Sequence, residues 1–268
     1  MSMYKAFYSL KQSPFSKDLP ARHLYASQSH KETLSRLKYL QQIRGIGVIT
    51  GESGIGKTTY LRAFVSQLNP SLYKVVYFPL STGTVMDFYR GIASGLGEIP
   101  QFRKVDLFHQ IQQAIHKSFK DSRITPVFIL DEMQLVTPKF LGELTILFNF
   151  EMDSKNPFIL ILSGLDYFLD KLKLNQNRPL SQRVVIRYEI EPLDETEFKA
   201  YVAHHLSLAG ANIPLFDEAA LNAIYQRSRG IPRVINTLCS NCLIQGSALK
   251  ASLISEEIVF QVSEELCF

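Results

Sequence analysis

Between residues 47 and 190, short continuous apolar runs alternate with longer segments of helical periodicity. Continuous apolar runs bounded by polar residues are typical of strands that are buried on both faces. They predict five strands, at Gly47–Thr50, Lys74–Pro79, Val127–Asp131, Phe158–Ser163 and Val184–Ile190. Helical patterns lie between them, around Thr58–Leu68, Met86–Leu96, Leu107–Phe119 and Lys139–Phe150. This alternation predicts an α/β fold with a parallel five-stranded sheet sandwiched between helices.

After Glu191 the pattern changes to helices alone, with Asp194, Asp217 and Ser255 suited to cap helix N-termini. The helices predicted here are Glu195–Leu208, Glu218–Arg227, Arg233–Gly246 and a last one from Ser255 to Leu266. The first 30 residues predict an irregular arm that leads to a helix at about Lys31–Gln42. The expected organisation is an arm over residues 1–30, an αβα core over 31–191 and a small helical lid over 192–268.

Composition narrows the class of protein but does not identify its reaction. The 268 residues are 46% hydrophobic and 20% charged, as in ordinary globular proteins, and the net charge of +4 permits nucleic-acid binding without demonstrating it. No apolar run approaches the roughly 20 residues of a membrane span. The start of the chain also lacks the apolar core of a secretory signal, so we expect a cytoplasmic protein without a membrane span.

Cys239 and Cys242 have the spacing of a redox or zinc motif, but the sequence has no second cysteine pair, and the paired histidines have no partner at metal-ligand spacing. Cys239 and Cys242 lie in an apolar helical stretch, and with Cys267 they make neither a disulfide framework nor a four-ligand zinc site. We expect buried free thiols. His204 and His205 are expected on a partly exposed helix surface.

The first chemical motif is a complete phosphate-binding loop, Gly51-Glu52-Ser53-Gly54-Ile55-Gly56-Lys57-Thr58, placed between a predicted strand and a predicted helix. Its glycines let the backbone wrap closely around phosphate oxygens, where a helix N-terminus adds partial positive charge. Lys57 reaches the β- and γ-phosphates, and the Thr58 hydroxyl suits a bound Mg²⁺. With Thr59, this run is the predicted ATP-binding set.

A second motif follows the strand Val127–Leu130, which ends in Asp131 and Glu132. Ligands bind at the carboxyl ends of parallel strands in open α/β sheets, so these acids predict a role for Asp131 in holding the metal and for Glu132 in polarising the attacking water. Along the chain, the strand Lys74–Pro79 falls between the two motifs. That fits the NTPase division in which another strand separates the two motif strands and a glutamate activates water. Together the motifs predict hydrolysis of ATP.

The loop, the Asp-Glu strand, the αβα core and the helical lid together resemble an AAA+ ATPase. The resemblance extends to the ATPases of the general-secretion-pathway A type, and the residues that carry it include Tyr4, Phe7, Leu10, Pro14-Phe15, Leu24-Tyr25, Gln182-Arg183-Val184, Pro192-Leu193 and Gly230-Ile231-Pro232-Arg233. Members of the secretion branch carry a membrane span and a cell-wall-binding region after the ATPase, whereas this sequence stops at Phe268. The resemblance therefore favours the other branch, ATPases similar to the TniB/MuB-type transposition regulators.

This resemblance implies roles for residues outside the two motifs. Tyr25 is similar to the segment that packs on the adenine, with hydrophobic anchoring of the arm as the alternative. Arg183 resembles the finger that a neighbouring subunit points at the γ-phosphate, with Arg178 and Arg187 as competitors, and Arg233 matches the lid arginine that senses this phosphate. Ser163 is a candidate polar sensor. Relatives often place Gln or Thr two positions further on, where this chain has Leu165, so slow or partner-dependent hydrolysis is one expectation.

The implied partners are duplex DNA, a transposase or related mobile-element protein, and further copies of the chain in a ring or filament. No DNA-binding motif stands out. Candidates for sequence-independent phosphate contact are basic and small polar residues expected on loops, namely Thr82, Thr84, Arg90, Arg103 and Lys104. Two other functions compete with transposition: a cytoplasmic energy-coupling ATPase of a secretion or envelope assembly system, and a nucleotide-gated signalling switch.

Overall fold

The computed structural model describes residues 3–16, 18–79 and 84–267, and the chain divides into two compact units. One unit contains the chain up to Lys31, the loop tip Gly54–Gly56 and everything from Glu191 onward. The other contains residues 32–53 and 57–190. We call them the helical unit and the sheet unit.

The sheet unit is built on five strands in the spatial order β2-β3-β4-β1-β5, and every neighbouring pair is parallel. The strands are β1 (Gly45–Thr50), β2 (Tyr73–Pro79), β3 (Thr125–Asp131), β4 (Ile159–Gly164) and β5 (Val184–Glu189). The predicted parallel αβα fold and all five predicted strands are thereby confirmed.

One expectation about the sheet needs correction. A strand does separate the two motif strands β1 and β3, but it is β4, while β2 lies at the edge of the sheet beside β3. The order of strands along the chain suggested β2, because sequence order does not reveal where a crossover helix returns the chain to the sheet. The exposure of Tyr77 on β2 agrees with its edge position.

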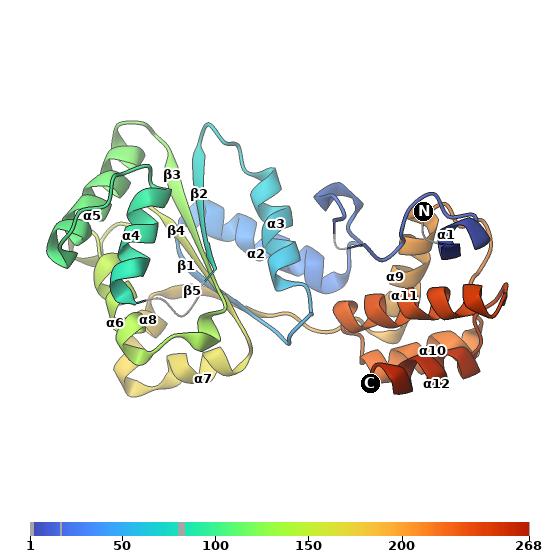
Figure 1. Cartoon of the computed structure of the whole chain (residues 1–268). Coiled ribbons are helices and arrows are strands. Elements are labelled where there is room, and N and C mark those ends of the chain that lie inside the picture. Colours follow the sequence, from blue (N-terminus) through green and yellow to red (C-terminus); the bar gives the residue numbers. More distant parts are fainter. Residues whose placement is uncertain (1–2, 17, 80–83, 268) are drawn as a thin grey trace. The chain divides into compact units, whose positions relative to one another are not determined.

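Helices cover both faces of the sheet (Figure 1). The helices of this unit are α2 (Gln28–Ile43, which begins in the helical unit), α3 (Lys57–Gln67), α4 (Val85–Gly95), α5 (Lys104–Lys120), α6 (Pro138–Leu147), α7 (Tyr167–Lys173) and α8 (Arg178–Gln182). Figure 1 shows α4, α5 and α6 on one face of the sheet and α2 and α3 on the other. Because both faces are covered, Val127–Leu130 of β3 are almost wholly buried, as their continuous apolar run predicted.

The helical unit contains α1 (Met3–Phe7), α9 (Glu195–Leu208), α10 (Glu218–Ser228), α11 (Pro232–Ala248) and α12 (Glu256–Glu265). The Asp194 and Asp217 carboxylates cap α9 and α10 by accepting the N–H groups of Glu197 (2.7 Å) and Ala220 (2.6 Å), as expected. Ser255 precedes α12, but its side chain makes no capping hydrogen bond.

The N-terminal segment belongs to the core of the helical unit. Tyr8, Leu10 and Phe15 are buried with apolar residues of α9 to α12, and the segment contains α1 where an irregular arm was expected. His205 is also buried, and its Nδ1 lies 2.9 Å from the carbonyl oxygen of Pro14. The expectation of a partly exposed surface is therefore wrong for His205, because the sequence pattern did not show that this segment covers α9.

Cys239 and Cys242 are buried free thiols of α11, as expected. Burial raises the pKa of Cys242 to about 12 and that of Cys239 well above its ordinary value, so both stay protonated at neutral pH. The described part of the chain contains no cluster of three or more His, Cys, Asp or Glu residues that could hold a metal ion. No helix in this part is long and apolar enough to span a membrane.

Candidate nucleotide site

The predicted phosphate-binding loop joins β1 to α3, so its N–H groups precede the first turn of a helix. Gly54 and Gly56 have φ values of +83° and +114°, which other residues rarely adopt, and they let the main chain curve. The Lys57 ammonium lies across the loop, where it donates to the carbonyl oxygens of Gly51 (2.7 Å) and Glu52 (2.9 Å). Positive charge and backbone N–H groups thus meet in one turn, the arrangement that suits a phosphate anion.

The end of β3 meets this loop. Asp131 is buried, and its Oδ2 accepts hydrogen bonds from the Thr58 hydroxyl (2.8 Å) and the Tyr77 hydroxyl (3.2 Å). The two predicted Mg²⁺ ligands, Thr58 and Asp131, therefore lie within hydrogen-bond distance of each other although 73 positions separate them. A hydroxyl and a carboxylate oxygen at this spacing suit a hard divalent cation.

Tyr77 is a member of this group that the sequence did not reveal. Tyr77 is exposed only in part, and its partial burial, the charge of Asp131 and the hydrogen bond to it raise the pKa of Tyr77 to about 12. The phenol therefore stays protonated at neutral pH and acts as a donor that fixes the Asp131 carboxylate. Nothing in the local sequence points to it, because the contact requires β2 to lie beside β3.

Glu132 follows in a left-handed backbone conformation, with φ +60° and ψ 35°. This conformation is uncommon for a residue other than glycine, and it often marks functional sites. The turn leaves Glu132 exposed beside the buried Asp131. The Glu132 Oε2 accepts a 2.5 Å hydrogen bond from the side chain of Gln134, another residue outside the predicted site.

Three buried polar atoms near the carboxyl ends of β1 and β4 lack a hydrogen-bond partner among the residues that the structure describes. They are Thr50 Oγ1, Ser163 Oγ and Asp166 Oδ1. Because buried polar atoms in folded proteins are nearly always paired, this edge of the sheet fits a polar ligand or bound water. The site therefore fits a nucleotide with Mg²⁺, because it combines the curved loop, the Lys57 ammonium, the Thr58–Asp131 pair and these unpaired polar atoms.

Asp166 is the first polar side chain after β4, one position beyond Leu165. Burial raises the pKa of Asp166, while the positive charge of Lys57 acts in the opposite direction. Ser163, the predicted sensor, is wholly buried within β4. Asp166 was not predicted as a sensor, because the resemblance points to position 165, one residue earlier.

The three candidate finger arginines differ in their contacts. The guanidinium of Arg183 donates to the carbonyl oxygens of Thr145 (3.1 Å) and Phe148 (2.5 Å) at the end of α6. Arg187 donates to the Ser181 carbonyl and hydroxyl oxygens. Arg178 is exposed, and its guanidinium makes no hydrogen bond or ion pair with the described part of the chain, although its backbone N–H donates to the carbonyl oxygen of Asn175.

Two further predicted residues lie in the helical unit. Arg233 is in the first turn of α11, and its N–H donates to the carbonyl oxygen of Gly54 (3.2 Å) at the loop tip, which belongs to the same unit. The Tyr25 ring packs against Tyr201 and His204, with centroid separations of 5.9 and 5.8 Å. This packing fits hydrophobic anchoring of the arm, and contact with adenine stays a prediction.

The predicted DNA-contacting residues that the structure describes lie on and around α4 and α5. Thr82 is outside the described residues; Thr84 caps α4, where its hydroxyl pairs with Asp87. Arg90 lies within α4 and Lys104 begins α5, so the expectation of loop positions is wrong for these two.

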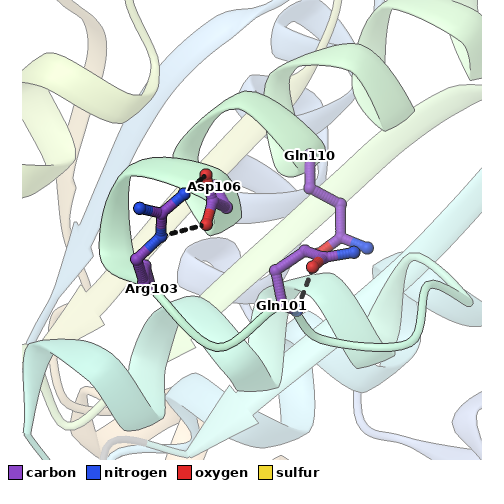
Figure 2. A network of polar contacts seen from close by, with 4 residues as sticks. All are labelled: Gln101, Arg103, Asp106 and Gln110. Atoms are coloured by element: carbon purple, nitrogen blue, oxygen red, sulfur yellow. Dashed lines mark hydrogen bonds and ion pairs between the residues drawn. The ribbon is translucent and has the colours of Figure 1, made fainter.

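Two of these cations already have acidic partners. The Arg103 guanidinium pairs with Asp106 at 2.8 Å, beside a loop held by hydrogen bonds between Gln110 and the backbone (Figure 2). Lys104 pairs with Glu143 at 2.5 Å. Exposed ion pairs contribute only about 0–1 kcal/mol, so a phosphate group can compete for the Arg103 side chain.

The phosphate-binding loop lies before α3, and the acidic pair lies at the end of β3, with β4 between the two motif strands β1 and β3. This arrangement defines a P-loop nucleotide-binding protein. The AAA domain family matches residues 40–172 of the chain. General secretion pathway protein A of Aeromonas hydrophila is 33% identical over 250 residues, covering 92% of this chain. The chain belongs to the AAA+ ATPases, in the superfamily of this protein, and its fold implies nucleotide binding and hydrolysis.

Solved structures agree on the fold. Cdc6p of Pyrobaculum aerophilum has a TM-score of 0.70 at 17% identity, with 94% of this chain and 70% of that one covered. The ORC1 protein of Aeropyrum pernix, solved in complex with DNA, has a TM-score of 0.70 at 15% identity, with 94% and 68% covered. The chain spans only 45% of the Aeromonas protein, so the activity of that whole protein does not follow from the match.

Proposed function

We propose that this chain is an Mg²⁺-dependent ATPase that assembles on duplex DNA and regulates a transposase. The observation that carries the ATPase part is the 2.8 Å hydrogen bond between Thr58 and Asp131, which joins the phosphate-binding loop to the end of β3. Without that junction the two motifs would be separate polar turns. With it, the pair that we propose as Mg²⁺ ligands follows Lys57 and precedes Glu132 in the chain, so both motifs belong to one site.

In this proposal each residue has one task. The loop N–H groups and Lys57 bind the ATP phosphates, while Thr58 and Asp131 hold Mg²⁺, which neutralises charge on the β- and γ-phosphate oxygens when bound. Glu132 orients the attacking water and accepts its proton on a carboxylate oxygen. Leu165 offers no polar side chain after β4, which supports slow hydrolysis that a partner stimulates.

DNA binding is supported by the fold and by the basic side chains near α4 and α5. The ORC1 protein with the same fold was solved with DNA bound, and Arg90, Arg103 and Lys104 belong to neighbouring segments of this chain. The transposition regulators that the sequence resembles assemble on duplex DNA, so a transposase is the proposed partner. A ring or filament of identical subunits would place many such side chains along one duplex.

We expect DNA binding that requires ATP, ignores base sequence and weakens steeply with salt. Phosphate contacts release condensed counterions, and each contact contributes about 0.9 to the slope of log affinity against log salt. Replacing Arg90, Arg103 and Lys104 together with alanine should therefore reduce this slope by roughly 2 to 3. Fluorescence anisotropy over a salt series, with two unrelated duplexes, measures both properties.

A matched control removes the same charge elsewhere. Lys38, Lys117 and Lys250 are exposed lysines outside the candidate set, and their replacement with alanine should leave the slope unchanged. Tight binding to one duplex alone, insensitive to salt, would contradict the proposal. An equal change of slope in both triple variants would mean that net charge matters and the candidate residues do not.

The second candidate function is energy coupling in a secretion or envelope assembly system, which the 33% identity to general secretion pathway protein A favours. Electron microscopy with ATP, in the presence and absence of duplex DNA, separates the two. Assembly that appears only with DNA supports a role in transposition. Identical ATP-dependent assembly in both samples, with no DNA bound, supports a role in secretion.

A further inference from the structure

The carboxylate of Glu132 is held by a single neighbouring side chain. Among the described residues, the one hydrogen bond to this carboxylate comes from the Gln134 amide, whose Nε2 lies 2.5 Å from Oε2. Glu132 is otherwise exposed, and its left-handed backbone turns it away from the buried end of β3. An exposed glutamate samples many rotamers, so whatever holds it determines where a water molecule is oriented.

Gln134 is itself fixed on every side. Its side chain is buried, and its Oε1 accepts the backbone N–H of Leu165 at 3.1 Å, just after β4. A Cβ added to Gly164 would lie 3.1 Å from this Oε1, which shows how closely β4 packs on the amide. The Lys171 ammonium of α7 donates to the carbonyl oxygens of Gln134 and Val136, so the main chain is held as well.

The chemistry of the two partners sets the orientation of the amide. Leu165 offers an N–H, which can only donate, and Glu132 offers a carboxylate, which when ionised can only accept. Glutamine has one acceptor and one donor group at its end, so it satisfies both at once. A glutamate here would face the Glu132 carboxylate with a like charge, and a methionine of similar length would satisfy neither partner.

We propose that Gln134 is a positioning residue for ATP hydrolysis, which holds the Glu132 carboxylate in place and ties it to the backbone after β4. This inference rests on the ATPase part of the proposed function and does not depend on DNA or a transposase. Asp166 and α7 continue directly from Leu165, so a movement of that segment reaches Glu132 through one amide.

The test is a double-mutant cycle with Gln134→Met and Glu132→Gln, measured by single-turnover and steady-state hydrolysis of ATP. If Gln134 acts through Glu132, Gln134→Met lowers kcat by roughly 10²-fold, as small misplacements of a reacting group do, with KM for ATP changed less than about twofold. In the Glu132→Gln background the same substitution should change the rate less than about twofold, because residues that act as a unit are not additive.

Gln112→Met is the matched control. This half-buried amide of α5 donates to the carbonyl oxygens of Leu147 (3.3 Å) and Asn149 (3.0 Å) and makes no hydrogen bond to Glu132, Gln134 or Lys171. It should lower Tm about as much as Gln134→Met and leave kcat within about threefold of the original chain. Affinity for a fluorescent ATP analogue should be unchanged in both variants.

Three results would overturn the inference: equal losses of kcat from Gln134→Met in both backgrounds, a loss expressed in KM, or an equal loss of kcat in Gln112→Met. Failure of the proposed function is recognisable separately. An unsubstituted chain that binds ATP without hydrolysing it, or a Glu132→Gln chain that hydrolyses at the original rate, overturns the role of Glu132 and with it the role of Gln134.

Discussion

Lys57→Ala is expected to abolish measurable nucleotide binding, whereas Glu132→Gln should retain ATP and hydrolyse it roughly 10² to 10⁴-fold more slowly. The first substitution removes the ammonium that pairs with phosphate charge and that also donates to the carbonyl oxygens of Gly51 and Glu52. The second removes only the group that orients water and accepts its proton. Glutamine keeps the size of the side chain, so the loop and Asp131 stay as they are.

Calorimetric titration with ATP and Mg²⁺, together with single-turnover hydrolysis, separates the two variants. Lys74→Ala is a fair control, because Lys74 also donates its ammonium to a backbone carbonyl, that of Leu96 at 2.7 Å, outside the loop. This variant should bind ATP normally. Equal loss of binding in Lys57→Ala and Glu132→Gln would show that Glu132 supports the fold of the site instead of the reaction.

The strands could be predicted from the sequence because a strand buried on both faces is a continuous run of apolar residues. Val127–Leu130 and Phe158–Leu162 are apolar without interruption, and both runs lie in the middle of the sheet. The order of the strands could not be predicted in the same way, since it depends on where each crossover packs. The short helices α7 and α8 were also missed, because 7 and 5 residues carry too little periodicity to distinguish them from a loop.

The site residues likewise differ in whether the sequence could predict them. Gly51–Thr58 and the Asp131-Glu132 pair are contiguous motifs, so the sequence located them. Tyr77 lies 54 positions from Asp131, and Gln134 reaches Leu165 across 31 positions. These contacts appear only after the sheet has brought β2, β3 and β4 together. Residues that orient the reacting groups are therefore the part that sequence patterns alone do not reveal.

The contacts of Arg183 change the expectation for the subunit that completes the site. An arginine supplied by a neighbour must present a guanidinium that its own chain does not use, and Arg183 already donates to the carbonyl oxygens of Thr145 and Phe148. Its replacement would leave those acceptors without this donor, at a cost of about 1–3 kcal/mol. We therefore favour Arg178, which is exposed and whose guanidinium makes no hydrogen bond within the described chain, as the finger in trans.

Arg178→Ala should bind ATP normally as a monomer and lose roughly 10³ to 10⁵-fold in hydrolysis by the assembled protein, the range that such fingers supply. Arg178→Lys should recover little, because an ammonium does not present the planar fork that fits phosphate oxygens. Arg183→Ala, in contrast, should chiefly lower Tm. Steady-state hydrolysis at a concentration that gives assembly, and thermal unfolding of each variant, test these expectations.

Mixing variants tests whether the arginine acts between subunits. An assembly of Arg178→Ala and Lys57→Ala chains contains sites made from Lys57 of one subunit and Arg178 of the other, and these sites are intact. Hydrolysis should therefore reappear in the mixture although each variant alone is inactive. With mixed assembly confirmed by microscopy, absence of rescue would assign Arg178 to its own subunit. Rescue with Arg183→Ala in its place would return the finger to Arg183 and require its guanidinium to leave the end of α6 when subunits meet.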